Sequence, residues 1–241
     1  MRRRSGVDGS RARTYRCSRF SGSTLARART ARRAPARDST SDLLDEPEKR
    51  RAILHAAVRV FAEKGYQGCR IADVARAAGV AYGLVYHYFR NKEALLEKVF
   101  EEQWTIFIEA IRAIREGPGS AAERLAGVCR FAVDVLKTAP AAVRVLLLEV
   151  ARTPNVVRAG STRQTFEEAV RLVAEMVREG QRAGDLRPDA DPVVAATGLL
   201  GALEMSLTAM VTGIVPSGTE AEVERAKQQV VAFVLGGLRG R

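Results

Sequence analysis

The pattern of apolar and polar residues over positions 70–92 predicts two short helices joined by a tight turn. Apolar residues recur at i, i+3, i+4 and i+7 in the first helix: Ile71, Val74, Ala75 and Ala78. Gly79 follows this helix, and glycine adopts the left-handed conformation that ends many helices at the lowest cost. Val80 is an apolar anchor just beyond the glycine.

The second helix of this pair has two chemically different sides. Its inner side carries Ala81, Val85 and Phe89. Its outer side carries Tyr82, Gly83, Tyr86, His87 and Arg90. Hydrogen-bonding rings, a cation and a glycine that permits close approach are typical of a helix in the DNA major groove. The alternative is a helical hairpin with a few surface aromatic residues, because such hairpins also occur in proteins that do not bind DNA.

A helix before this pair and a long helix after it complete the pattern. Asp45 and Glu48 have the spacing of a capping box, and the helix that they begin ends at Gly65. Asn91 can cap a long helix that ends near Glu116. This long helix would connect a DNA-reading domain to the rest of the chain.

The remaining sequence predicts helices only. Proline and glycine residues separate five further apolar segments of helical period, at about 120–138, 140–152, 158–183, 191–213 and 219–238. No stretch alternates with a period of two for long enough to predict a strand. The expected fold class is all-α with about nine helices. Residues 45–91 form a three-helix helix-turn-helix domain, and residues 92–241 form a helical ligand-binding and dimerisation bundle.

The apolar segment 193–215 is long enough to cross a membrane. Its only charged residue, Glu204, lies near the middle, and the segment contains three glycines and no aromatic belt. We therefore expect a helix buried in a bundle or in a dimer interface, and no membrane partner.

The net charge of +11 comes almost wholly from the amino-terminal tail. Residues 1–40 contain twelve arginines and two aspartates, whereas residues 41–241 contain 27 basic and 26 acidic residues. Residues 1–44 show no apolar period and are expected to be disordered. They could be a phosphate-binding arm, a transit peptide or the product of a start codon placed too far upstream. We favour the last interpretation or an unstructured arm.

Cysteine and histidine usage favours neither a metal site nor a disulfide framework. Cys17, Cys69 and Cys129 are far apart, and His55 and His87 form no cluster with them. This pattern suits a reducing compartment, and we expect a cytoplasmic protein. The sequence also contains no nucleophile elbow, phosphate-binding loop or paired carboxylates, so we expect neither an enzyme nor a cofactor.

The segment IADVARAAGVAYGLVYHYFRNKEALL (residues 71–96) resembles the DNA-binding domain of the tetracycline repressor (TetR) family of bacterial regulators. The preceding helix, which ends in AVRVFAEKGYQG, matches as well, so the resemblance covers about 48 residues, from Glu48 to Leu96. Beyond this segment the resemblance is architectural. It implies a homodimer formed by the last two helices, a palindromic double-stranded operator, and repression until a small-molecule effector binds.

The resemblance also implies which residues contact DNA: Arg70, Tyr82, Gly83, Tyr86, His87, Tyr88 and Lys92. Tyr82, Gly83 and Tyr86 match positions that reach base edges or the adjacent sugar-phosphate. His87 and Lys92 match positions that contact phosphate, and the remaining tyrosine lies at the edge of the outer face.

Two positions depart from the family pattern. Arg70 stands where the family usually has a small hydroxyl residue that caps the following helix, so the cap is in question and a phosphate contact becomes an alternative. Tyr82 replaces a more common polar or basic residue, so the operator sequence cannot be inferred from a relative.

Candidate effector-binding residues are large or polar side chains within the helical bundle: Trp104, Phe107, Phe131, Leu147, Phe166, Met176, Glu204, Met205 and Thr208. Each also suits ordinary core packing. Glu149 and Glu204 lie in apolar runs and could meet a cationic ligand, an arginine or a hydroxyl group. Because no acidic cluster is evident, we expect a largely apolar ligand, such as an acyl or aromatic compound. The alternative function is a helical small-molecule-binding or interaction protein without sequence-specific DNA binding.

Overall fold

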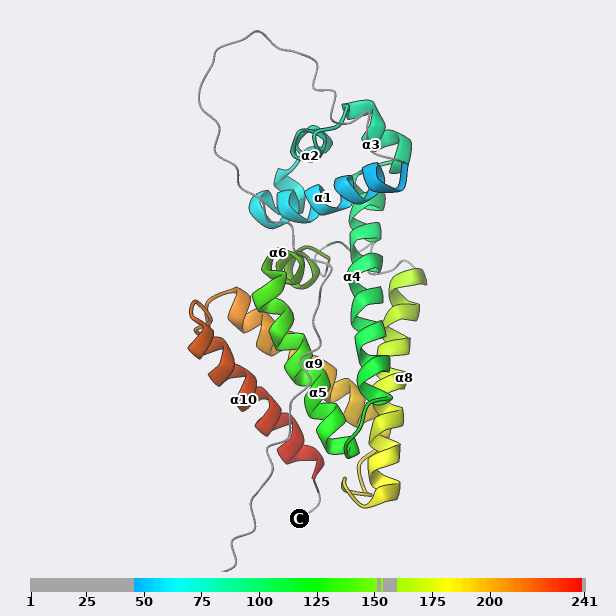
Figure 1. Cartoon of the computed structure of the whole chain (residues 1–241), viewed down its shortest axis with the longest axis vertical. Coiled ribbons are helices and arrows are strands. Elements are labelled where there is room, and N and C mark those ends of the chain that lie inside the picture. The colour runs from blue at the N-terminus through cyan, green and yellow to red at the C-terminus, as the bar shows by residue number, and fades with distance from the viewer. Residues whose placement is uncertain (1–45, 151–152, 154–159, 240–241) are drawn as a thin grey trace, which may run out of the picture. The chain divides into compact units, whose positions relative to one another are not determined.

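The structure is a computed structural model that describes residues 46–150, 153 and 160–239 (Figure 1). Its elements are α1 (Glu46–Gly68), α2 (Ile71–Ala78), α3 (Tyr82–Tyr88), α4 (Lys92–Arg115), α5 (Ala121–Thr138), α6 (Pro140–Arg144), the π-helical turn η2 (Val145–Val150), α8 (Gly160–Ala183), α9 (Pro192–Val211) and α10 (Glu220–Leu238). These residues form nine α-helices and no strand, which confirms the all-α prediction. The predictions for the tail and for the Asp45 cap lie outside the described residues.

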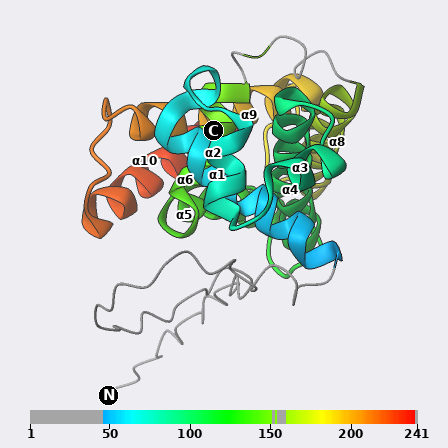
Figure 2. The same cartoon turned by 90° about the horizontal axis from the view of Figure 1, so that it is seen from above.

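Helices α1, α2 and α3 pack with the first half of α4 around one apolar core, which we call the head core. Phe61, Val74 and Phe100 are buried there. Val85 and Phe89 are also buried in this core, which confirms their predicted inner position, whereas Ala81 is exposed. The outer residues of α3 are thus exposed, and Figure 2 shows this helix with α1 and α2 from above.

The turn between α2 and α3 has the predicted geometry. Gly79 has φ 67° and ψ 29°, the left-handed conformation that favours glycine. The Val80 N–H donates to the Ala75 carbonyl at 3.0 Å, as in a Schellman cap. At the start of α4, the Asn91 Oδ1 accepts a hydrogen bond of 2.7 Å from the Ala94 N–H, so the predicted cap is confirmed.

A second apolar core, which we call the body core, lies among α4, α5, α8, α9 and α10. Trp104, in the middle of α4, packs against the body core and also against the head core. The long helix therefore connects the two cores, as its length predicted.

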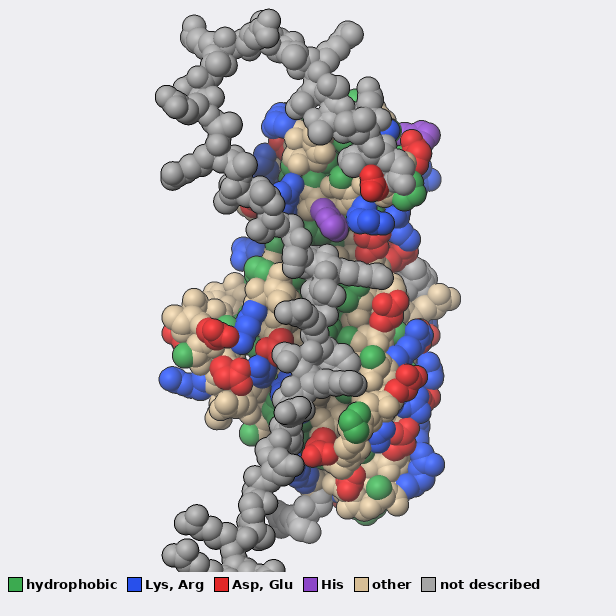
Figure 3. All heavy atoms as spheres, in the orientation of Figure 1, with side chains coloured by type: hydrophobic (Ala, Val, Ile, Leu, Met, Phe, Trp, Pro, Cys, Tyr) green, Lys and Arg blue, Asp and Glu red, His purple; other side chains and the backbone are tan. Residues whose placement is uncertain are grey.

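Ion pairs join α4 to α8 along the outside of the body core. Arg115 binds Glu175 at 2.5 Å and Glu179 at 2.9 Å, and Arg112 pairs with Glu168 one turn earlier. Basic and acidic side chains accordingly lie next to one another on the side of the molecule that α8 occupies (Figure 3). Because these charges form a network, they fix the long helix more firmly than isolated surface pairs would.

The segment after Pro140 differs from the continuous α-helix that the sequence predicts. It is α-helical over Pro140–Arg144 and then widens into a π-helical turn over Val145–Val150. Tertiary contacts accompany this widening, since Val145 is buried in the head core. Such turns are rare and occur often at functional sites.

Helix α9 is only partly buried in the single chain, so the predicted burial in a dimer interface stays a prediction. Ala196, Leu199 and Leu203 face the core, but Val194 and Met205 are 69% and 68% exposed. Among the described residues, α9 is the helix that is long and apolar enough to cross a membrane, and 22% of its apolar stretch is buried.

Candidate nucleic-acid interface and effector region

The exposed side of α3 presents two tyrosines. Tyr82 and Tyr86 are 54% and 43% exposed, and their rings meet edge to face with centroids 5.2 Å apart. The Tyr82 hydroxyl donates to the Tyr86 hydroxyl at 3.3 Å. The hydrogen bond between the two hydroxyls raises the pKa of Tyr86 above its usual 10.0. A Cβ atom placed on Gly83 would meet no atom within 4 Å, so the surface is open beside the tyrosines.

The other predicted contacts on α3 differ in their environment. His87 is exposed, and its ring lies 5.2 Å from the Tyr88 ring. The Tyr88 hydroxyl bonds to Glu46, donating to its carbonyl at 3.2 Å and to its carboxylate. Tyr88 therefore connects α3 to the start of α1, and its contact with DNA stays a prediction.

Arg70 is the N-cap residue of α2, and its side chain has no hydroxyl group to cap the helix. Its own N–H donates to the Asp73 carboxylate at 2.9 Å, so the acid three residues on supplies the cap. Lys64 also binds Asp73, at 2.8 Å, and lowers the pKa of that carboxyl together with the Arg70 N–H. The guanidinium of Arg70 lies on an exposed residue, which leaves the phosphate contact as a prediction.

Lys92 has an internal role that sequence reasoning missed. Its ammonium group donates to the carbonyls of Tyr66 and Cys69, at 2.6 and 3.1 Å, and lies 4.4 Å from the centroid of the Tyr66 ring. It thus holds the turn between α1 and α2 against the start of α4. Its predicted phosphate contact is untested.

The side chain of Glu149 binds a backbone amide of the head. Its Oε2 accepts a hydrogen bond of 2.7 Å from the Tyr66 N–H. In the sequence, Glu149 is recognisable only as an acid within an apolar run, and this does not identify the Tyr66 N–H as its partner.

Four of the candidate effector residues lie together. The rings of Trp104, Phe107, Phe131 and Phe166 form a connected series, with centroid distances of 5.4 Å from Trp104 to Phe107, 6.3 Å from Phe107 to Phe131 and 4.8 Å from Trp104 to Phe166. Phe100 of the head core lies 5.7 Å from Trp104. This aromatic series joins α4, α5 and α8.

The other candidate effector residues have no aromatic ring and lie elsewhere in the bundle. Met176 is fully buried in the body core, and Leu147 is half-buried in η2. Glu204 and Met205 are exposed on α9, where the Thr208 hydroxyl donates to the Glu204 carbonyl at 2.8 Å. The structure therefore does not bring the nine candidates into one site.

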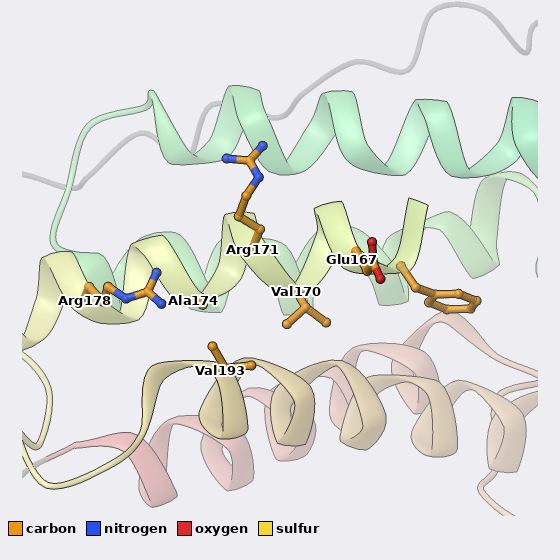
Figure 4. Close-up of a pocket in the computed structure, with 7 residues that line it drawn as sticks. Glu167, Val170, Arg171, Ala174, Arg178 and Val193 are labelled. Atoms are coloured by element: carbon orange, nitrogen blue, oxygen red, sulfur yellow. The ribbon is translucent and has the colours of Figure 1, made fainter. Parts of the chain in front are cut away.

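A surface hollow lies between α8 and α9 (Figure 4), with a volume of about 390 Å³. Val170 and Val193 point toward one another across it, whereas Arg171 points away from α9. Phe166 belongs both to the lining of this hollow and to the aromatic series. Within the described ranges, no three His, Cys, Asp or Glu side chains are grouped to hold a metal ion.

A small helical domain with an exposed recognition helix, carried on a helical bundle, defines a helix-turn-helix transcription regulator. Two family models match: "Bacterial regulatory proteins, tetR family" over residues 53–99 and "Tetracyclin repressor-like, C-terminal domain" over residues 118–208. The chain belongs to the TetR family of ligand-responsive, DNA-binding transcription regulators, which confirms the resemblance seen in residues 48–96.

Known proteins that resemble the chain include regulators of fatty acid metabolism. The fatty acid metabolism regulator protein of Bacillus subtilis (strain 168) is 29% identical over 159 residues, which cover 66% of this chain and 81% of that protein. The structure of the fatty acid degradation regulator FadR from Bacillus halodurans is 27% identical, with a TM-score of 0.72, and covers 82% of this chain and all of its own. The structure of FadR from Bacillus subtilis in complex with stearoyl-CoA shares the fold, with 24% identity, a TM-score of 0.70 and coverage of 78% and 98%.

Proposed function

We propose that this protein is a homodimeric repressor that binds a palindromic operator through two α3 helices and leaves it when an acyl ligand binds the body. The outer face of α3 carries this proposal, because Tyr82 and Tyr86 stand exposed above the fully buried Val85. The residues assigned to DNA contact, on this face and beside it, are Arg70, Tyr82, Gly83, Tyr86, His87, Tyr88 and Lys92. Such binding takes place in the bacterial cytoplasm, and the body needs no catalytic group for it.

The exposed apolar side chains of α9 and α10 support the homodimer. Val194 and Met205 on α9 and Phe233 on α10 are exposed in the single chain. Apolar patches of this kind mark interaction surfaces, and a twofold axis would bury them against their own copies. The two α3 helices would then contact half-sites about 34–36 Å apart.

The aromatic series of Trp104, Phe107, Phe131 and Phe166 supports an apolar effector. It lies along α4, whose first residue, Lys92, contacts the turn before α2. A ligand that moves α4 would therefore change the position of the head. The resemblance to fatty acid regulators favours a long-chain acyl compound, and the stearoyl-CoA bound to one of them makes stearoyl-CoA the first probe.

Selection of duplexes by the full-length protein tests this function. We expect an inverted repeat to be recovered from a random library in the presence of excess competitor DNA, which removes binding by the arginine-rich tail. Stearoyl-CoA should then release the selected duplex, and coenzyme A alone should not. Recovery of no common sequence would contradict operator binding, whereas release by both compounds or by neither would contradict the acyl effector.

A further inference from the structure

Residues 65–69 form the last turn of α1 and begin at an unusual break in its backbone. Gly65 has φ 71° and ψ 156°, which interrupts α1 and frees the next N–H from the helical hydrogen-bond pattern. That N–H, of Tyr66, donates to the Glu149 carboxylate at 2.7 Å. A residue 83 positions away along the chain therefore supplies the cap that this turn needs.

A second charged side chain holds the opposite end of the same turn. The Lys92 ammonium group binds the carbonyls of Tyr66 and Cys69. The turn is thus fixed between an anion on its N–H side and a cation on its carbonyl side, an arrangement that matches the polarity of its peptide groups. We call this arrangement of Glu149, the turn 65–69 and Lys92 the clasp.

The anion of the clasp comes from η2, outside the helix-turn-helix segment. The Glu149 carbonyl accepts a hydrogen bond of 2.8 Å from the hydroxyl of the buried Thr153, which fixes the end of η2. Val145, at the beginning of η2, is fully buried in the head core. This π-helical turn is therefore anchored to the head by an apolar contact at one end and by a charge-assisted hydrogen bond at the other.

We propose that Glu149 is a positioning residue for operator binding, which fixes the orientation of the helix-turn-helix on the body through the Tyr66 N–H. This inference rests on the proposed binding of a palindromic operator. A dimer reads two half-sites only when the distance between its recognition helices matches their spacing. Without the carboxylate, the charge-assisted hydrogen bond between η2 and the turn is lost while the apolar contact of Val145 remains, so the head can adopt a wider range of orientations.

The two expected effects of Glu149→Ala are distinct. Affinity for the best-spaced operator falls roughly tenfold, the ratio that corresponds to a charge-assisted hydrogen bond of about 1.4 kcal/mol. The preference for that spacing also falls, because a less constrained head fits neighbouring spacings almost as well. A general loss of stability would lower the affinity for every spacing by the same factor.

The experiment measures the dissociation constants of the full-length protein for the selected duplex and for duplexes whose half-sites are one and two base pairs closer or farther apart. Glu149→Ala is compared with the wild type, with Glu149→Gln, which keeps an oxygen acceptor, and with Glu109→Ala. Glu109 is an exposed acid on α4, so the last variant controls for the loss of one negative charge. Circular dichroism verifies that each variant is folded, and Glu149→Gln takes the place of Glu149→Ala if the latter is not.

We expect a sharp spacing profile for the wild type and for Glu109→Ala, a flat profile for Glu149→Ala and an intermediate one for Glu149→Gln. A Glu149→Ala profile as sharp as that of the wild type would overturn the positioning role and leave operator binding intact. A wild type that prefers no duplex would overturn operator binding itself, and the positioning role with it.

Discussion

The hydroxyl of Tyr82 lies 3.3 Å from the hydroxyl of Tyr86 on the outer side of α3, one helical turn apart. Each hydroxyl has hydrogen-bonding capacity left for DNA, because a phenol both donates and accepts. Replacement of either tyrosine by phenylalanine should weaken operator binding by about 1 kcal/mol, or roughly fivefold in Kd. Fluorescence anisotropy with the selected duplex measures this change.

The same substitutions should leave the melting temperature almost unchanged, since exposed side chains contribute little to stability. A scrambled duplex of equal length separates base contacts from phosphate contacts. If the hydroxyls contact bases, the loss of affinity is confined to the selected duplex. An equal loss on both duplexes would contradict base reading by these tyrosines.

The outer face of the last two helices gives a second prediction. Phe233 on α10 is 77% exposed in the single chain. If α9 and α10 form the dimer interface, Phe233→Glu would bury two symmetric carboxylates without partners. The dimer dissociation constant should rise about a hundredfold or more. Sedimentation velocity over a range of concentrations gives this constant.

Ile106→Glu is the matched control for the interface. Ile106 is also an exposed large apolar residue, but it lies on α4. This variant should remain dimeric at the concentrations at which Phe233→Glu is monomeric. Dissociation in both variants, or in neither, would contradict an interface formed by α9 and α10.

The elements that could be predicted from the sequence are those whose signals are local. Gly79 and Asn91 end and begin helices through their own conformation or side chain, so their roles follow from a few neighbouring residues. The buried position of Val85 follows from helical period alone. The TetR motif then made the class of the protein recognisable from residues 48–96.

The features that could not be predicted depend on contacts between distant segments. Nothing near Glu149 indicates that its partner is the Tyr66 N–H, and nothing near Lys92 indicates the Tyr66 carbonyl. The π-helical turn is likewise invisible in the sequence, because its residues suit an α-helix equally well. The effector candidates stay predictions, and the sequence could not sort them by position for a similar reason: apolar period does not distinguish an interior face from the exposed face that carries Met205.

A buried lysine gives a prediction about pH. Lys227 on α10 binds Asp134 on α5 at 2.8 Å and Glu224 at 2.6 Å. Burial lowers the pKa of Lys227, but hydrogen bonds from its ammonium group to Asp134 and Glu224 outweigh this effect and raise the pKa above its usual 10.5. The hydrogen bond from Lys227 lowers the pKa of Glu224 below its usual 4.5.

Lys227→Met should therefore destabilise the fold by about 1 kcal/mol at pH 7. Methionine replaces the long aliphatic part of the lysine side chain, but the ion pairs of the ammonium group are lost. The difference in the free energy of unfolding between the wild type and Lys227→Met should shrink as acid protonates Glu224 below its usual pKa of 4.5. It should shrink again as base deprotonates Lys227 of the wild type above 10.5. Urea unfolding at several pH values measures it.

Lys137→Met is the control for this network. Lys137 contacts the same Glu224, but at 3.8 Å and from an exposed position. Its substitution should cost less than about 0.5 kcal/mol at any pH. Equal costs for the two lysines would show that burial of Lys227 is unimportant.

Trp104 is the single tryptophan of the chain and lies in the aromatic series that we assign to the effector. Stearoyl-CoA that enters this region should change the polarity around the indole ring and shift its fluorescence emission. The shift should saturate at the concentration that releases the operator, because one binding event causes both effects. Coenzyme A without an acyl chain should cause neither.

Phe166→Ala connects this signal to the site. The Phe166 ring lies 4.8 Å from that of Trp104, and its loss should weaken stearoyl-CoA binding about tenfold, as expected for one lost aromatic contact. Operator affinity without the ligand should change less than stearoyl-CoA affinity, because Phe166 lies on α8, outside the helix-turn-helix, and its ring is 6.0 Å from that of Phe100 in the head core. Operator release with unchanged Trp104 emission would instead place the effector away from α4, and the long helix would then not be the element that the ligand moves.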